Sequence, residues 1–443
     1  MDGKKLHSAF QRLLSIFPVI SIRAGSAATS YLSQLLIARF FVSDHDFGLY
    51  ALFLTAVNLA SIFLKGGLDT ATIKYISFYR SIKDVREHSF MVFSYGYIFV
   101  SIFILWFLMS FDFTRAAISL VGLPANDKHI GFVVFSILAL SIGQIQRASI
   151  VAKKHPIASE WHNGVVRPLL TTLLVFLFNC YDGSPDYLIV AQSYTLSVLI
   201  SSIIGGVING YYSERSELNY FLVFNLIKEN ATSWLRTSLF MSVNVILRQV
   251  FKSADIFFCG YFLGAKYVAY YAAATRIADL VVFGLSSTNM IFAPKISERF
   301  HGNDFKGLQD IVRSSSRLVF FLGLLFFIFI LFFGYFLLGF FGENYRVAYG
   351  ALLVLSLGQL INSYYGPIGY LASMTGNERK LTKIIILISP VVILIYIILI
   401  PFVGIAGAAI GSAFGTIGWN VFLDREIRRV IDIDSRAYLW RGK

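Results

Sequence analysis

The chain has 443 residues, of which 56% are hydrophobic, 16% aromatic and only 14% charged. About a quarter of the residues of an ordinary soluble domain are charged, so this composition excludes a soluble globular protein and indicates an integral membrane protein. The formal net charge of +13 does not require a nucleic-acid partner, because the basic residues gather in one set of loops between apolar segments. Two cysteines, Cys180 and Cys259, are too few for a disulfide framework.

Twelve apolar segments are long enough to cross a membrane, which takes about 20 mostly apolar residues. The first follows the basic sequence MDGKKLHSAFQRLL and resembles a signal peptide. It runs on past Ala38 without a small-residue cleavage site, so we predict an uncleaved first helix. The twelve predicted transmembrane helices are 13–41, 47–73, 89–110, 130–151, 157–180, 186–212, 234–263, 267–293, 316–340, 347–374, 382–402 and 404–423.

Basic residues alternate between the two sides of this twelve-helix topology. The loops on one side and the C-terminal tail carry nearly all of them, whereas the loops on the other side hold only Arg115, Lys128, Lys266 and Arg346. Cytoplasmic loops carry the excess of Lys and Arg, so both termini are predicted to be cytoplasmic. In this topology Arg80 and Arg428 are surface charges.

The helices form two halves of six, residues 1–212 and 234–443, and the second half includes the basic tail. Residues 213–233 are predicted to be a cytoplasmic linker. Its sequence FLVFNLIK is expected either to lie flat on the membrane surface or to begin the seventh helix. A short apolar stretch at 116–124 is placed at the outer interface.

The two halves share a pattern that suggests an internal repeat. Residues 46–77 and 267–298 each contain a short polar step, a long apolar helix and a basic end, and an apolar helix precedes each. At one constant offset Tyr50 aligns with Tyr271, and Lys74 aligns with Lys295. A twofold internal repeat in an apolar chain is typical of a secondary transporter.

Several segments resemble a known transporter family. FGLYALF, GGLDTATIKYIS, ADIFFCGYFLGAKYVAYYAAATRI, APKISERFHGNDFKGL, FGENYRVAYGALLVLSLGQ and PFVGIAGAAIGSAFG are similar to the polysaccharide-transporter branch of the MATE-like MOP exporter superfamily. The resemblance implies two six-helix bundles forming a V, and a Wzx-type flippase for lipid-linked oligosaccharides. It also implies undecaprenyl as the lipid carrier and the bacterial inner membrane as the location.

The sequence lacks several motifs that are typical of enzymes and of metal sites. It contains no GxxxxGK[ST] phosphate loop, no HExxH, no CxxC pair and no GxSxG elbow. We therefore predict neither enzymatic activity nor a bound cofactor or metal. Gly407, Gly411 and Gly415 form a stripe of small residues, which indicates close helix packing within the chain rather than dimerisation.

The candidate functional residues of the sequence are charged side chains inside the predicted membrane helices. A charged side chain at the bilayer centre is costly and normally faces a wet cavity or a partner. Arginine also presents a fixed fork of donors that matches phosphate oxygens. The candidate substrate-binding residues are Arg23, Arg167, Arg248, Lys252 and Arg276.

Two acids accompany these cations in the second half. Asp255 follows Lys252, and Asp279 follows Arg276, each by three positions. Either they belong to structural ion pairs, or they take part in coupling transport to an ion while the arginines line a central cationic cavity. In the first half, the only acid expected inside a helix is Asp69, near the cytoplasmic end. The deep charge of that half is then positive, which favours an anionic cargo.

The sequence is thus interpreted as a flippase that moves an undecaprenyl-pyrophosphate-linked oligosaccharide, an O-antigen or exopolysaccharide repeat unit, by alternating access. Its partners would be that lipid-linked oligosaccharide, membrane lipid and other polysaccharide assembly proteins, and no nucleic acid. One alternative is a cation-coupled multidrug exporter of the MATE type. Another is a membrane glycan polymerase or ligase, which would be expected to carry a large outer loop for its active site.

Overall fold

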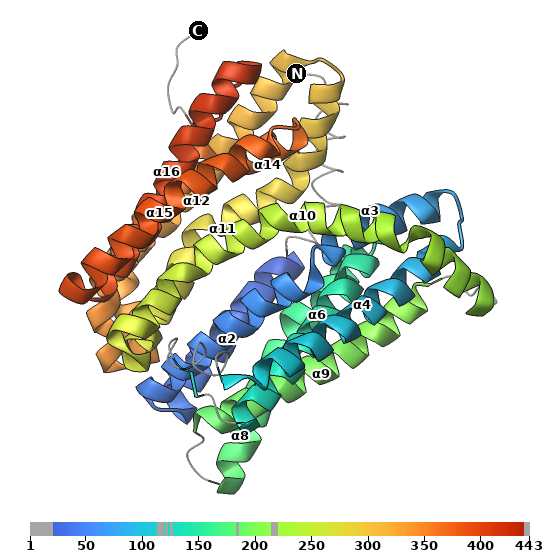
Figure 1. The fold of residues 1–443 in the computed structure, drawn as a ribbon. Helices are drawn as coiled ribbons and strands as arrows, with labels where there is room; N and C mark the ends of the chain where they lie inside the picture. The colour runs from blue at the N-terminus through green and yellow to red at the C-terminus, as the bar shows by residue number, and fades with distance from the viewer. Residues whose placement is uncertain are drawn as a thin grey trace. The chain divides into compact units, whose positions relative to one another are not determined.

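The computed structural model describes residues 21–112, 119, 123–124, 127–182, 186–213 and 220–437. Throughout these ranges the regular elements are helices, and no strand occurs in them (Figure 1). The prediction of an all-α chain is confirmed. The short stretch 116–124 lies largely outside the described residues, as does the start of the first predicted helix.

Ten helical segments in the described part of the chain are long and apolar enough to cross a membrane. They make the chain a multi-pass membrane protein. Two predicted spans are not among them: 13–41 begins outside the described residues, and 234–263 carries Arg236, Arg248, Lys252 and Asp255. The ten segments are Asp44–Lys65, Arg86–Met109, His129–Ala152, Pro156–Tyr181, Tyr187–Tyr211, Ala265–Leu285, Phe305–Phe341, Glu343–Tyr365, Glu378–Val403 and Ile405–Ile431.

The chain divides into two compact units. Unit 1 comprises residues 1–46 and 53–246, and unit 2 comprises residues 47–52 and 247–443. A helix over residues 21–36 opens the described part of unit 1. The elements that follow it are η1 (Ile37–Phe41), α2 (Asp44–Lys65), α3 (Leu68–Ser81), α4 (Arg86–Met109), α6 (Asp127–Ala152), α7 (Pro156–Glu160), η2 (Trp161–Val166), α8 (Arg167–Asp182) and α9 (Tyr187–Tyr211).

Helix α10 (Tyr220–Leu263) contributes residues to both units. The segment FLVFNLIK belongs to this helix. It therefore begins the seventh predicted helix, which was one of its two predicted placements. The remaining elements, all of unit 2, are α11 (Ala265–His301), α12 (Phe305–Phe341), η3 (Glu343–Ala348), α13 (Tyr349–Tyr365), α14 (Ile368–Met374), α15 (Glu378–Val403) and α16 (Ile405–Ile431).

The second predicted helix, 47–73, is not continuous. It breaks between α2 and α3 at Gly66 and Gly67, whose φ angles of 51° and 77° lie in the left-handed region. Glycine adopts this conformation without the steric cost of a Cβ atom. The buried ammonium of Lys65, 2.8 Å from the Asp69 carboxylate, joins the two helices across the break. The helix aligned with this segment in the second half, α11, has no such break.

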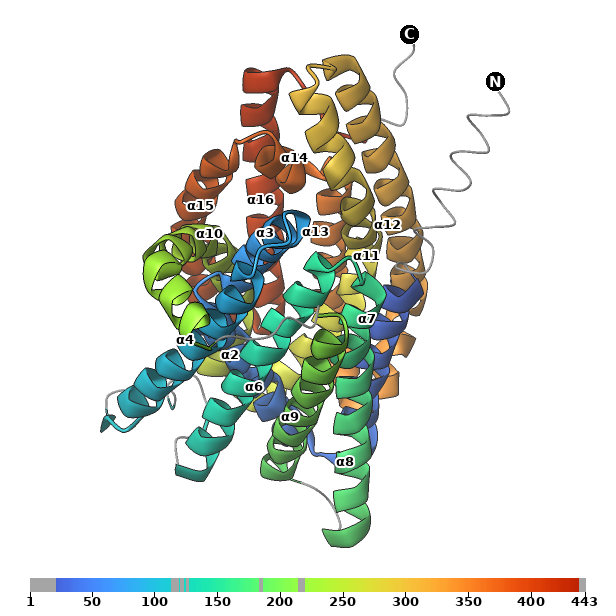
Figure 2. The same ribbon diagram turned by 90° about the vertical axis from the view of Figure 1, so that its right-hand side faces the viewer.

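The core of unit 1 is held by small polar side chains as well as apolar ones. Helices α6 and α9 lie side by side (Figures 1 and 2). They are joined by hydrogen bonds from Ser202 Oγ to the Ala139 carbonyl at 2.6 Å and between Ser136 and Thr195 at 2.8 Å. Small hydroxyl residues allow close helix approach in membranes and satisfy one another there.

In unit 2 the glycine stripe of α16 packs against helices of the same chain. A Cβ atom on Gly407 would lie 2.6 Å from the Leu399 backbone of α15, and one on Gly411 would lie 2.4 Å from the Tyr396 ring. A Cβ atom on Gly415 would lie 2.4 Å from the Phe251 ring of α10. The prediction of packing within the chain is confirmed, since these approaches leave no room for any side chain.

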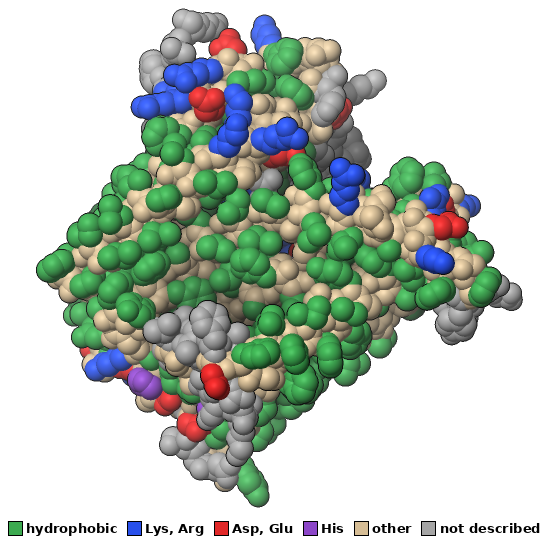
Figure 3. Space-filling model, in the orientation of Figure 1, with side chains coloured by type: hydrophobic (Ala, Val, Ile, Leu, Met, Phe, Trp, Pro, Cys, Tyr) green, Lys and Arg blue, Asp and Glu red, His purple; other side chains and the backbone are tan. Residues whose placement is uncertain are grey.

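Large apolar side chains are also exposed in rows along several helices. On α4 the row includes Phe99, Phe103, Trp106 and Phe107, and on α12 it includes Leu325, Phe329, Phe332 and Phe336. Hydrophobic side chains cover much of the face drawn in Figure 3. Contiguous exposed apolar surface of this kind is expected where helices contact lipid acyl chains.

Candidate functional site

A carboxylate at the end of α7 collects two arginines from other segments of unit 1. Arg23 Nη2 lies 3.1 Å from Glu160 Oε1, and Arg147 Nη2 of α6 contacts the same oxygen. The Glu160 side chain is only 10% exposed, whereas those of Arg23 and Arg147 are 27% and 38% exposed. Two guanidinium groups therefore share one nearly buried carboxylate, and the cluster keeps a positive charge.

Close helix contacts bring the helix of residues 21–36 to this carboxylate. A Cβ atom on Gly164 would lie 2.4 Å from Ser26 Oγ, so only glycine permits this approach. Further along the same two helices, Ser33 donates to the Pro168 carbonyl at 3.0 Å and accepts from Thr172 at 2.7 Å. Arg23 is thereby held within reach of Glu160.

The segment after Glu160 is a π-helix, η2, which continues directly into α8. Single-turn π-helices occur preferentially at functional sites. Asn163 of η2 accepts a long hydrogen bond of 3.5 Å from Arg167, whose guanidinium lies 5.9 Å from the centre of the Tyr194 ring. Arg23, Arg147 and Arg167 thus lie around α7 and η2, and of these Arg147 was not among the predicted substrate-binding residues.

Glu160 corrects one prediction from the sequence. We expected Asp69 to be the only acid inside a helix of the first half, but Glu160 lies in the helical span Pro156–Tyr181. It was missed although it falls inside the predicted helix 157–180. Its spacing from the only cation on its own helix, Arg167, gave no signal, and its partners come from distant parts of the sequence.

A second buried charge cluster lies at the end of α6. Lys153 Nζ donates to the Asn209 side chain at 2.8 Å and to Ser213 Oγ at 2.6 Å. It also lies 3.9 Å from the Glu87 carboxylate. Burial lowers the pKa of Lys153 to about 8; the Glu87 charge acts in the opposite direction, and Arg80 lowers the pKa further. This lysine fastens α6 to the end of α9.

Arg80 and Arg428 are not free surface charges, so that prediction is wrong. Arg80 donates to the Tyr212 carbonyl at 3.1 Å. Arg428 Nη2 lies 2.7 Å from Asp424, whose side chain is 2% exposed. A charge that neutralises a buried acid contributes to packing. Residues near the predicted loops are therefore also part of the core.

In unit 2 a buried carboxylate lies in the middle of a hydrogen-bonded group. Asp255 of α10 is 3% exposed and accepts from Tyr271 Oη of α11 at 2.7 Å and from the Ile256 amide at 2.8 Å. The Ser412 side chain of α16 also hydrogen-bonds to it. Asp255 therefore joins three helices of unit 2. Lys252, one turn earlier on α10, is exposed.

The other candidate cations of unit 2 are on the surface of the unit. Arg248 of α10 and Arg276 of α11 are exposed, whereas Asp279 is half-buried. The assignment of these cations to substrate binding remains a prediction.

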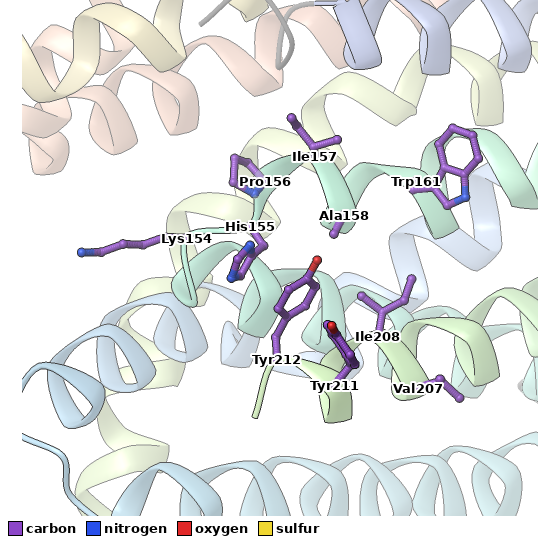
Figure 4. A pocket seen from close by; sticks show the side chains of 10 residues that line it. All are labelled: Lys154, His155, Pro156, Ile157, Ala158, Trp161, Val207, Ile208, Tyr211 and Tyr212. Atoms are coloured by element: carbon purple, nitrogen blue, oxygen red, sulfur yellow. The ribbon is translucent and has the colours of Figure 1, made fainter. Parts of the chain in front are cut away.

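A pocket of unit 1 lies beside α7, and none of the arginines around Glu160 lines it. It has a volume of about 650 Å³ and is lined by residues of the α6–α7 turn, α7, η2 and the end of α9 (Figure 4). His155 stacks on Tyr212 at 3.8 Å between ring centres. The arginine cluster is a stronger candidate site than this pocket. Aromatic and aliphatic side chains dominate the pocket lining, and Lys154 is its one permanently charged group. In the described part of the chain, no group of three or more His, Cys, Asp or Glu side chains could hold a metal.

The fold is that of known membrane transporters. The chain superposes on an inward-facing multidrug resistance MATE family transporter of the MOP superfamily with a TM-score of 0.71 at 15% identity, covering 94% of this chain and 98% of the other. It superposes on the lipid II flippase MurJ, inward closed, with a TM-score of 0.74 at 15% identity, covering 92% and 87%. The chain therefore has the fold of these two proteins.

A third similar structure is a MOP superfamily transporter from Pyrococcus furiosus, described as having a binding pocket of reverse polarity (TM-score 0.62, 15% identity, 94% of each chain covered). The sequence model of the polysaccharide biosynthesis protein family matches residues 20–300, and the MatE model matches residues 241–413. A search of curated protein sequences gives no match. The chain belongs to the polysaccharide biosynthesis protein family, which confirms the family resemblance seen in the sequence.

Proposed function

We propose that this transporter is a flippase for an oligosaccharide linked to undecaprenyl pyrophosphate, such as an O-antigen or exopolysaccharide repeat unit. It would move the head group across the bacterial inner membrane by alternating access while the prenyl tail stays in lipid. Its partners would be the lipid-linked oligosaccharide, membrane lipid and other polysaccharide assembly proteins.

The observation that carries this proposal is the excess of arginine around Glu160. Two guanidinium groups, those of Arg23 and Arg147, contact one carboxylate, and a third, that of Arg167, lies against Asn163 on the same helical span as Glu160. A cationic drug would be repelled by this charge, whereas the two phosphates of a pyrophosphate would be attracted. Arginine suits this task because its donors match phosphate oxygens in pairs.

Unit 2 would contribute the exposed cations Arg248, Lys252 and Arg276. Each lies on a helix of the unit and has an exposed side chain, so each is accessible to a head group. Asp255 is buried and already accepts three hydrogen bonds. We assign it to holding α10, α11 and α16 together or to ion coupling, and not to contact with an anionic cargo.

A cation-coupled multidrug exporter is the second candidate. The match of residues 241–413 to the MatE model and the buried acids Glu160 and Asp255 favour it. Such exporters need a carboxylate that can exchange its cation. Glu160 is already paired with two arginines, and this makes the exporter the weaker candidate.

The test is a flipping measurement with purified protein in proteoliposomes. A lipid-linked oligosaccharide with a pyrophosphate is placed in one leaflet, and its arrival in the other leaflet is followed by an enzyme that acts only on exposed head groups. Efflux of a cationic dye is measured on the same preparation. Flipping without dye efflux supports the proposal.

Two other results would contradict it. Dye efflux driven by a cation gradient, with no movement of the oligosaccharide, would assign the chain to multidrug export. Formation of a longer glycan in a defined mixture of lipid-linked repeat units would assign it to the polymerases. Liposomes without protein and liposomes containing the Arg23→Ala protein serve as controls for leakage.

A further inference from the structure

A basic groove lies between the first turns of α15 and the last turns of α16, separate from the residues assigned to the cargo. It has a volume of about 350 Å³. Helix α15 contributes residues at positions 380, 383, 384 and 387, and α16 contributes 422, 425, 426 and 429. Each set has the i, i+3, i+4, i+7 spacing of one helix face. The lining residues are Lys380, Lys383, Ile384, Leu387, Phe422, Arg425, Glu426 and Arg429.

Cations outnumber acids in this groove. Glu426 is the only acid in its lining, and it is shared by Lys380 and Arg429, each at 3.2 Å. The exposed side chains of Lys383 and Arg425 add positive charge that this carboxylate does not neutralise. Figure 3 shows Lys and Arg side chains gathered at the top of the view, over the part of unit 2 where α16 ends.

The groove continues into an exposed apolar stripe on α15. Leu387, Val391, Leu394 and Ile398 are 69%, 46%, 55% and 47% exposed and follow one another at helical spacing. The stripe extends about 16 Å at 1.5 Å per residue. A ligand that fits both parts has an anionic head and an apolar chain.

The position of the groove agrees with such a ligand. Helices α15 and α16 are consecutive candidate membrane spans joined at Gly404, so residue 380 and residue 429 lie at the same end of a helical hairpin. Basic pockets between transmembrane helices at the membrane surface are suited to phospholipid head groups. The volume is at the low end of the range of about 300–1,000 Å³ for ligand sites, enough for a phosphate head group and too little for an oligosaccharide.

We propose that this groove binds an anionic phospholipid of the surrounding leaflet, with its phosphate between Lys383 and Arg425 and one acyl chain along the apolar stripe of α15. The bound lipid would fill the space between the ends of α15 and α16 and neutralise the basic rim. This site is independent of the proposed flippase activity, since none of its residues belongs to the arginine cluster of unit 1 or to the cations assigned to the cargo.

The test is native mass spectrometry of the purified full-length protein with phosphatidylglycerol, cardiolipin or phosphatidylcholine. The variant Lys383→Gln/Arg425→Gln removes two charges and keeps polar side chains of similar length. Its affinity for phosphatidylglycerol should fall roughly thirtyfold, because each basic residue near an anionic lipid surface contributes a factor of about five. The matched control Lys306→Gln/Arg313→Gln removes two charges outside the groove and should bind as the wild type does.

A second variant, Leu387→Gln, addresses the apolar stripe and should also weaken binding. The proposal would be overturned if the wild type bound phosphatidylcholine as tightly as phosphatidylglycerol. It would also be overturned if the control variant lost as much affinity for phosphatidylglycerol as the groove variant. If inorganic pyrophosphate displaces the lipid and Leu387→Gln has no effect, the groove is a phosphate site and not a lipid site. If lipid-linked oligosaccharide displaces phosphatidylglycerol at equal concentration, the groove belongs to the cargo path and the proposal also fails.

Discussion

The guanidinium of Arg23 lies 3.1 Å from the carboxylate of Glu160, and this ion pair joins the helix of residues 21–36 to α7. Arg147 contacts the same carboxylate from α6, so three segments of unit 1 meet at one acid. Removing one partner of such a cluster leaves uncompensated charge, and the cost is larger the less water reaches it. The cluster therefore has a structural role even if the arginines also attract cargo.

The structural role of Glu160 predicts a measurable coupling. Glu160→Gln leaves two partly exposed arginines without their acid and should lower the unfolding free energy by about 1–3 kcal/mol, below the 3–5 kcal/mol typical of a fully buried pair. The double variant Arg23→Gln/Glu160→Gln should be more stable than the sum of the single losses predicts. Thermal unfolding of the detergent-solubilised protein gives the coupling energy as a double-mutant cycle.

The matched comparison is Glu343→Gln. Its partner Arg346 lies three residues away, and its own side chain is 74% exposed, so that variant should change stability little. Strict additivity of Arg23→Gln and Glu160→Gln would show that the pair contributes no interaction energy of its own.

Much of the fold could be predicted from the sequence because lipid imposes a simple rule. Segments of about 20 apolar residues must become helices whose backbone groups are satisfied internally. The predicted segments 89–110, 130–151 and 186–212 therefore agree closely with α4, α6 and α9. The close packing of α16 at its glycine stripe could also be predicted, since the spacing places all three glycines on one face.

The site could be predicted only in part, because its partners are distant in sequence. Arg23 was selected for its depth, but nothing near it in the chain indicates Glu160. The ion pair of Arg428 with buried Asp424 likewise depends on which face of α16 turns inward. The break at Gly66 and Gly67 had a local signal, two adjacent glycines, but the apolar run across them favoured one helix.

That break predicts a stability difference between two glycines. Gly67 has a φ of 77°, and a Cβ atom there would lie 2.2 Å from the Ser238 carbonyl of α10. Gly67→Ala should therefore lower stability by about 2 kcal/mol or more, through backbone strain and overpacking together. Gly210→Ala is the control, because a Cβ atom there meets nothing within 4 Å. Equal melting temperatures of the two variants would contradict the argument.

The charge distribution between helices predicts the topology. Reporter fusions after Lys154, Arg313 and Lys380 should report cytoplasm, and fusions near Asp44 and Glu343 should report the outside. The N- and C-termini should then both be cytoplasmic. The measurement uses paired reporters, one active only in the cytoplasm and one active only outside. A single fusion site at which the paired reporters give the opposite location would contradict the topology of twelve helices.

The cargo role of the arginines predicts how export responds to charge and to geometry. Arg23→Ala leaves Glu160 paired with Arg147, and Arg248 is exposed, so both alanine variants should remain folded in the membrane. Each should lower export about tenfold or more, since a hydrogen bond to a charged group contributes about 1.5–3 kcal/mol. Lysine at either position keeps the charge but not the paired donors, so it should restore export only in part.

The exposed Lys306→Ala should not change export. The measurement is complementation of glycan export in a flippase-deficient strain, with protein abundance determined in parallel. Normal export by the double alanine variant at normal abundance would exclude the cargo role, whereas loss of the protein from the membrane would assign the arginines to the structure.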